Sequence, residues 1–169
     1  HGYAWKVRRM SGTDPETEIR VAMIDAIKTN AGVMATALGA EPRVFNRVPG
    51  TCAFPFIEIT SRYRPWDTSA TEEESGRGGE HDVELRLMGE YEGDQEGNAI
   101  LWAIRNLFLD WTATLIGHRI VNVELKFSDV REGEDAKRYL GLQTWRVVSE
   151  EIDPGEEPIG WDDGEPIGW

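Results

Sequence analysis

The chain is poor in cysteine, in basic residues and in long apolar runs, and each shortage excludes a class of protein. Cys52 is the one cysteine among 169 residues, which excludes an internal disulfide and a zinc site built from several thiolates. Lysine and arginine number 18 against 31 acidic residues, and the net charge of −13 argues against a surface that grips nucleic acid. A membrane-spanning helix needs a run of about 18 apolar residues, and no run in this sequence is that long, so we expect no membrane partner.

The acidic residues are concentrated at the end of the sequence. Residues 150–169 hold eight acidic residues and no basic one. The same segment contains a tandem repeat, because 157–161 and 165–169 both read Glu-Pro-Ile-Gly-Trp. Proline and glycine in each copy disfavour helices and strands. Tryptophan often anchors interfaces, so we expect Trp161 or Trp169 to dock in a groove of a neighbouring subunit.

Hydrophobic periodicity predicts three helices. Apolar residues recur every three or four positions in each, which is the spacing of one buried helical face. A capping box opens the first helix, Asn30 caps the second, and Gly117 is placed to end the third. The expected ranges are 13–29, 30–39 and 94–117.

Alternating apolar and polar residues predict four strands, at 54–63, 82–91, 119–127 and 139–149. The sequence also allows a short strand at 43–46, but it does not decide whether this strand forms. The alternation assigns the following side chains to the apolar faces: Ile57, Ile59, Val83, Leu85, Leu87, Tyr91, Val121, Val123, Leu125 and Phe127.

The element order ααββαββ predicts the fold class. Two hairpins joined by a long helix indicate an α+β, two-layer domain, in which helices cover one face of a mostly antiparallel four-stranded sheet. We divide the chain into an N-terminal arm at 1–12, this domain at 13–150, and an acidic, tryptophan-containing tail at 151–169.

Both predicted hairpins have unusually long connections, at 67–81 and 128–137. A long loop in a compact domain is usually functional, so we expect these loops to contact partner proteins. With the two tail tryptophans, their charged residues form the candidate partner interface: Glu72, Glu73, Glu74, Arg77, Arg131, Glu132, Glu134, Trp161 and Trp169.

No residue pattern predicts catalysis. His81 in a loop, His118 at a helix end and Cys52 after a turn lie outside any nucleophile or metal-binding motif. The glycines at 76–79 lack the strand and helix that flank a phosphate loop, and 129–135 misses the spacing of an EF-hand. We therefore expect a protein that is not an enzyme and that uses no cofactor or metal.

Several local patterns occur in an order that resembles one family. They are the helix at 15–29, Arg43-Val44-Phe45 after the short helix, the Val48-Pro49 turn, the strand after Pro55, Trp66, the strand at 83–87, the helix ending at Gly117, and the closing Thr144-Trp145-Arg146-Val147-Val148. Over residues 14–150 the chain resembles the tail terminator, or tail completion, proteins of long-tailed phages and of gene transfer agents.

The resemblance implies a structural virion protein without catalytic residues. Members form a ring, usually of six subunits, on the last ring of tail-tube protein. The ring stops tube growth, presents a surface to the head connector and lets DNA pass through its lumen. The implied location is the head-proximal end of the tail, after assembly in the cytoplasm of a bacterial host.

Three other interpretations stay open at this point. Another head–tail junction protein would bind a portal or adaptor rather than the tail tube. A small α+β enzyme or ligand-binding domain would present a pocket with convergent polar groups. An adaptor protein would bind its partner through the acidic tail alone.

Overall fold

The computed structural model describes residues 14–66, 78–91, 93–113, 115–134 and 137–152. In chain order the elements are α1 (Pro15–Thr29), α2 (Ala31–Met34), β1 (Val44–Phe45), β2 (Phe56–Pro65), β3 (Gly78–Gly89), α3 (Gln95–Phe108), β4 (His118–Glu132) and β5 (Tyr139–Glu151). The predicted arm at 1–12 and the repeats of the predicted tail lie outside the described residues.

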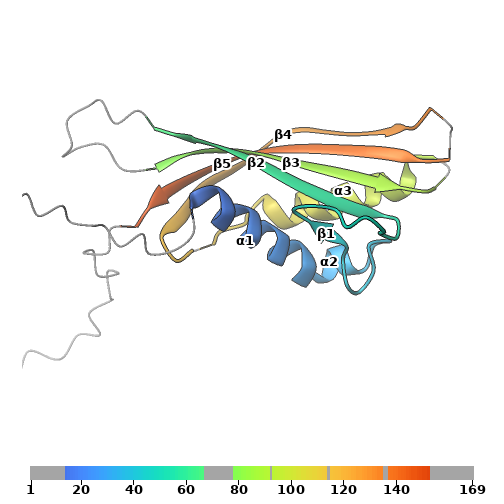
Figure 1. The fold of residues 1–169 in the computed structure, drawn as a ribbon, viewed down its shortest axis with the longest axis horizontal. Coiled ribbons are helices and arrows are strands. Elements are labelled where there is room, and N and C mark those ends of the chain that lie inside the picture. Colours follow the sequence, from blue (N-terminus) through green and yellow to red (C-terminus); the bar gives the residue numbers. More distant parts are fainter. Residues whose placement is uncertain (1–13, 67–77, 92, 114, 135–136, 153–169) are drawn as a thin grey trace, which may run out of the picture.

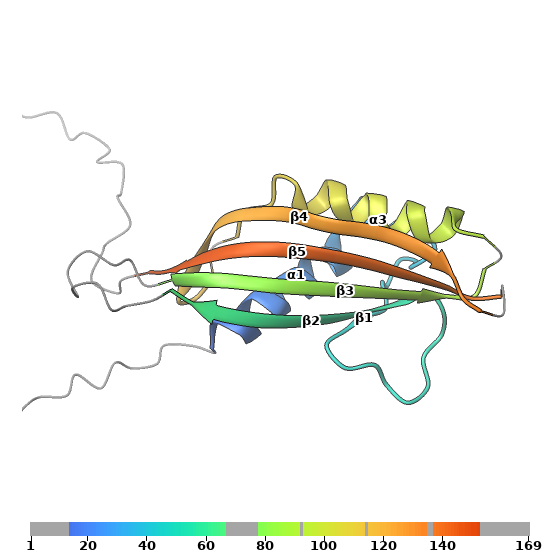
Figure 2. The same ribbon diagram turned by 90° about the horizontal axis from the view of Figure 1, so that it is seen from above.

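One sheet, in the order β1-β2-β3-β5-β4, forms the first layer, and the helices form the second. Figure 1 shows all three helices on the same side of the sheet, and Figure 2 shows α3 running along the β4 side. The α+β class is therefore confirmed. The prediction of four strands in the order ααββαββ is wrong, because β1 adds a fifth strand between α2 and β2.

Strand β1 enters the sheet through parallel pairing with β2. Val44 lies beside Ile57 and Phe45 beside Glu58, and the Ile57 amide donates to the Arg43 carbonyl over 2.8 Å. Two residues are too few to display an alternating pattern. The sequence could therefore leave this strand only as an open interpretation.

The core fills the space between the sheet and the helices. In β2 and β3 the alternation predicted the buried side chains correctly, because Ile57, Ile59 and Leu85 are fully buried. They pack against one face of each long helix and against β5. The remaining members of the core include Ile19, Met23, Ile27, Val83, Leu87, Ile100, Leu101, Ile104, Phe108, Trp145 and Val147.

Helix α1 begins at Pro15, two residues after the expected start at 13. Asp14 is the N-cap, and its carboxylate accepts hydrogen bonds from the Thr17 amide over 2.9 Å and the Thr17 hydroxyl over 2.8 Å. These bonds lower the pKa of Asp14, because they favour the charged form. Proline at the next position has no amide to satisfy, so it suits the first helical turn.

Helix α3 ends at Phe108, well before the predicted end at Gly117. The chain then turns and lies beside the start of β4, where the Ile120 amide donates to the Ala113 carbonyl over 3.2 Å. Trp111 and Leu115 still pack against the core, so the apolar pattern continues without a helix. In this segment, backbone hydrogen bonds to the start of β4 replace those of a helix. The periodicity of the apolar residues alone did not reveal this change.

Two register shifts in β4 overturn part of the predicted inward face. They lie between Ile120 and Asn122 and between Leu125 and Phe127, and each inserts an extra residue opposite β5. As a result Val121 is 57% exposed and Phe127 is 44% exposed, while Ile120 is buried. A bulge changes which side of the sheet the following residues face, so strict alternation fails here.

The strands are longer, and the connections shorter, than the sequence predicted. Strand β3 already begins at Gly78, inside the predicted loop at 67–81, and β4 continues to Glu132. Tyr91 lies beyond β3 and is exposed instead of inward. The ends of these strands are polar or rich in glycine, so the alternating pattern does not extend to them. Their backbones nevertheless pair fully, β3 with β2 and β4 with β5.

Candidate assembly surface

Among the described residues, no helix or strand covers the face of the sheet opposite the helices (Figure 1). The strand register places charged side chains on this face in a regular pattern. In one row across four strands, Arg62 of β2 lies beside Asp82 of β3, then Arg146 of β5, then Glu124 of β4. Positive and negative side chains thus alternate from strand to strand. We call this surface the outer face.

Ion pairs connect several charged side chains of the outer face into a network. Arg64 contacts Asp82 over 3.1 Å, and Arg146 contacts both Glu80 and Glu124. The hydrogen bond from Arg146 lowers the pKa of Glu80 and raises the pKa of Arg146, since it favours both charged forms. Exposed pairs of this kind add little to stability, but they give a surface specificity for a complementary partner.

Apolar side chains occupy the end of the outer face nearer the β4–β5 hairpin. Met88, Phe127 and Leu140 are 37%, 44% and 46% exposed. The bulge in β4 brings Phe127 to this side, where it pairs across strands with Thr144 of β5. Charged and apolar zones on one surface are typical of a protein interface.

Strand β4 forms one edge of the sheet, because β5 is the one strand that pairs with it among the described residues. It has 15 residues, so a long row of backbone donors and acceptors faces outward. Bulges and charged side chains, both present in β4, are the usual protection of such edges. The edge is therefore a second surface that a neighbouring chain can contact.

The structure describes three residues of the predicted partner interface. Arg131 and Glu132 lie at the end of β4, where Arg131 contacts Asp129 over 2.9 Å, and Glu134 lies in the exposed turn. They sit at the opposite end of the sheet from Trp66 and Gly78, where the other predicted loop begins and ends (Figure 2). Glu72, Glu73, Glu74, Arg77, Trp161 and Trp169 lie outside the described residues.

The inner face contains a polar cluster that sequence reasoning missed. His81 is not in a loop but in β3, fully buried, with its Nε2 2.7 Å from the Ser149 hydroxyl. His118 opens β4, and its Nδ1 lies 2.5 Å from Glu18 of α1. Extending the alternation of β3 backwards by one step from Val83 would have placed His81 inward.

A histidine beside a serine invites comparison with a catalytic pair, but the geometry supports a structural role. Both side chains are 0% exposed, so no substrate can reach them. Tyr63 packs on the imidazole, with ring centroids 4.7 Å apart. Within the described ranges, no group of His, Cys, Asp and Glu side chains could hold a metal ion.

Burial of His81 predicts acid sensitivity. Desolvation, with a smaller contribution from His118, lowers its pKa from 6.5 to about 4. The unfolded chain therefore binds a proton that the folded chain rejects, and stability falls as pH drops from 6.5 towards 4, by about 1.4 kcal/mol per pH unit. We expect urea unfolding between pH 7 and 5 to show this slope, and His81→Gln to lose it. An equal slope in both proteins would assign the acid sensitivity to other groups.

The comparison with protein families identifies the chain. The model of the family described as tail completion protein gp17 matches residues 21–150, most of the sequence. The chain belongs to the tail completion protein gp17 family. The resemblance seen in the sequence is thereby confirmed. Family membership places this tail completion protein in the virion tail as a structural component, which argues against an enzyme.

A solved structure shares the fold of this tail completion protein. The matching chain comes from a structure titled "Virion of native gene transfer agent (GTA) particle", with a TM-score of 0.66 and 17% identity. The match covers 82% of this chain and 99% of the other. No curated protein sequence matches. Among the described residues, no helix has the length and apolar character that crossing a membrane requires.

Proposed function

We propose that this tail completion protein forms a closed ring on the head-proximal end of the tail tube. The ring, of six subunits, ends tube growth and joins the tail to the head connector, while DNA passes through its lumen. Other subunits, the tail-tube protein and a connector protein are the partners. The observation that carries the proposal is the uncovered, charge-alternating outer face in a chain of the tail completion family.

Ring geometry requires two different surfaces on each subunit, because the contacts between neighbours are heterologous. The outer face and the β4 edge are two such surfaces, and they differ in chemistry. The outer face offers paired charges and an apolar zone, whereas the edge offers backbone hydrogen-bonding groups. A ring built from them would leave few of these groups unpartnered.

The charge of the chain also suits a channel for DNA. Non-specific DNA binding depends on lysine and arginine that neutralise phosphates. This chain has 18 lysine and arginine residues against 31 aspartate and glutamate residues. A lumen that does not hold DNA would let the DNA slide.

Arg62 offers a sharp test of the outer face. It is exposed and forms no ion pair with another described residue, so changing it leaves the internal network intact. We expect Arg62→Glu to raise the concentration at which rings form by about tenfold, because one repelled contact repeats at every interface. Lys28→Glu, with the same charge change in the helical layer, is the matched control. Light scattering over a concentration series, with negative-stain imaging, measures both.

Tail-tube ends decide between the ring and the alternatives. A ring, or a monomer that forms rings only when tube ends are added, supports the proposal. A stable monomer or dimer that ignores tube ends contradicts it. Binding to the connector without binding to the tube would instead assign the chain to another position in the head–tail junction.

A further inference from the structure

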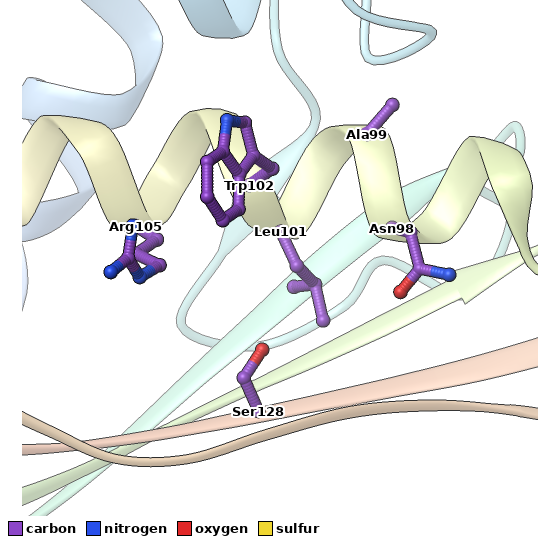
Figure 3. A pocket seen from close by; sticks show the side chains of 6 residues that line it. All are labelled: Asn98, Ala99, Leu101, Trp102, Arg105 and Ser128. Carbon is purple, nitrogen blue, oxygen red and sulfur yellow. The ribbon is translucent and has the colours of Figure 1, made fainter.

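A groove lies between α3 and β4, on the helical side of the β4 edge. It measures about 450 Å³ and is lined by Asn98, Ala99, Leu101, Trp102, Arg105 and Ser128. Figure 3 shows Leu101 pointing from the helix towards Ser128 of the strand, with Arg105 one turn further along. The groove therefore has an apolar floor and polar groups on its rim.

Trp102 is the unusual residue of this groove. It is 59% exposed, and the guanidinium of Arg105 stacks on its ring, 4.7 Å from the centroid. An exposed tryptophan beside an unpaired strand edge is a liability for a soluble chain. Something that covers both the ring and the groove would remove that liability.

We propose that the second repeat of the acidic tail, residues 165–169 of the same chain, docks in this groove before the subunit assembles. Proline keeps the segment extended, and extended proline-containing segments bind aromatic grooves at low entropic cost. Trp169 then packs against Trp102 and the apolar floor. Glu165 would then pair with Arg105, the basic side chain that lines the groove. The charges are complementary, because residues 150–169 hold eight acidic residues and no basic one.

The length of the tail selects the second repeat. Strand β5 carries the chain away from Gln143, which pairs with Ser128 beside the groove, to Ile152, nine residues on. The tail must return over about 30 Å, at 3.3 Å per residue. Trp161 also lies nine residues beyond Ile152, so it could reach the groove only through a fully extended chain, with no residues left to form the turn that reverses the chain direction. The 17 residues to Trp169 span up to about 58 Å, which leaves enough chain for that turn.

The same chain is favoured over a neighbouring copy in dilute solution. A tethered segment has an effective concentration in the millimolar range, far above that of other copies at micromolar protein. An intrinsic Kd near 1 mM is then enough to keep the groove about half occupied. Docking of this kind requires no ring, so it can hold or fail independently of the proposed function.

Site-directed crosslinking of the full chain tests this placement. In a Cys52→Ser background, Ala99→Cys is combined with Ile167→Cys, and a short thiol–thiol crosslinker is added at micromolar protein. We expect an intrachain product, identified by gel mobility and peptide mass. Replacing Ile167→Cys by Ile159→Cys moves the thiol to the first repeat, whose tether is too short, and we expect at most a tenth of the yield.

Val21→Cys controls for random collisions of the tail. Val21 is 48% exposed on α1, close to where β5 ends, because Glu18 of that helix contacts His118 and His118 pairs with Glu151. A tail that samples the surface at random would therefore label position 21 at least as well as position 99. Docking predicts the reverse, and also predicts a loss of about threefold with Arg105→Glu, which repels Glu165.

The outcomes separate clearly. An intrachain link from position 99 to 167 that exceeds both controls and weakens with Arg105→Glu supports the proposal. A mainly interchain link would make a neighbouring copy the occupant and overturn it. Equal labelling of positions 99 and 21, or equal yields from positions 159 and 167, would overturn it as well.

Discussion

Gly89→Ala is expected to destabilise the fold by about 3 kcal/mol, because the new methyl group would overlap a ring that cannot move. A Cβ at position 89 would lie inside the Tyr139 side chain. Tyr139 is 1% exposed, and its hydroxyl donates to the Glu96 carboxylate over 2.7 Å. Gly97 of α3 limits the other side of the ring, since a Cβ there would lie 2.9 Å from it.

Urea unfolding at neutral pH measures this effect as a lower transition midpoint at an unchanged slope. Gly50→Ala is the matched control, because a Cβ at position 50 meets nothing within 4 Å, and we expect its midpoint to stay close to that of the wild type. The double variant Gly89→Ala with Tyr139→Ala should lose less stability than the two single losses added together. Simple additivity would show that the clash is not the cause.

Trp145→Ala is expected to have the larger effect, a loss of about 4 kcal/mol. The side chain is 1% exposed at the centre of β5, and its ring lies edge-on to Phe108 of α3. Its indole N–H donates to the Gln143 side chain over 2.9 Å. Alanine would leave a cavity between the layers and would also leave that buried amide oxygen without its donor.

Trp102→Ala provides the comparison for the same change of side chain. Trp102 is 59% exposed, so we expect its loss to change stability by less than about 1 kcal/mol, mostly through the contact with Arg105. Urea midpoints and far-UV circular dichroism report on both variants. If Trp145→Ala were no more harmful than Trp102→Ala, β5 could not be the centre of the core.

Local patterns in the sequence were enough to predict the fold class, most elements and the family. Helical spacing placed the buried face of α1, and alternation placed Ile57, Ile59 and Leu85 in the core. These features follow from local periodicity, because one face of each element must be apolar to bury itself. The order of the patterns was enough to indicate a tail completion protein, which the family match confirmed.

Tertiary structure alone decided the features that depend on a partner strand. The pairing of β1 with β2, the bulges that turn Val121 and Phe127 outward, and the end of α3 at Phe108 all arise from backbone hydrogen bonds between distant segments. Such bonds leave no period in the sequence. The alternating charges of the outer face emerge for the same reason, since only the register of four strands brings Arg62, Asp82, Arg146 and Glu124 into one row.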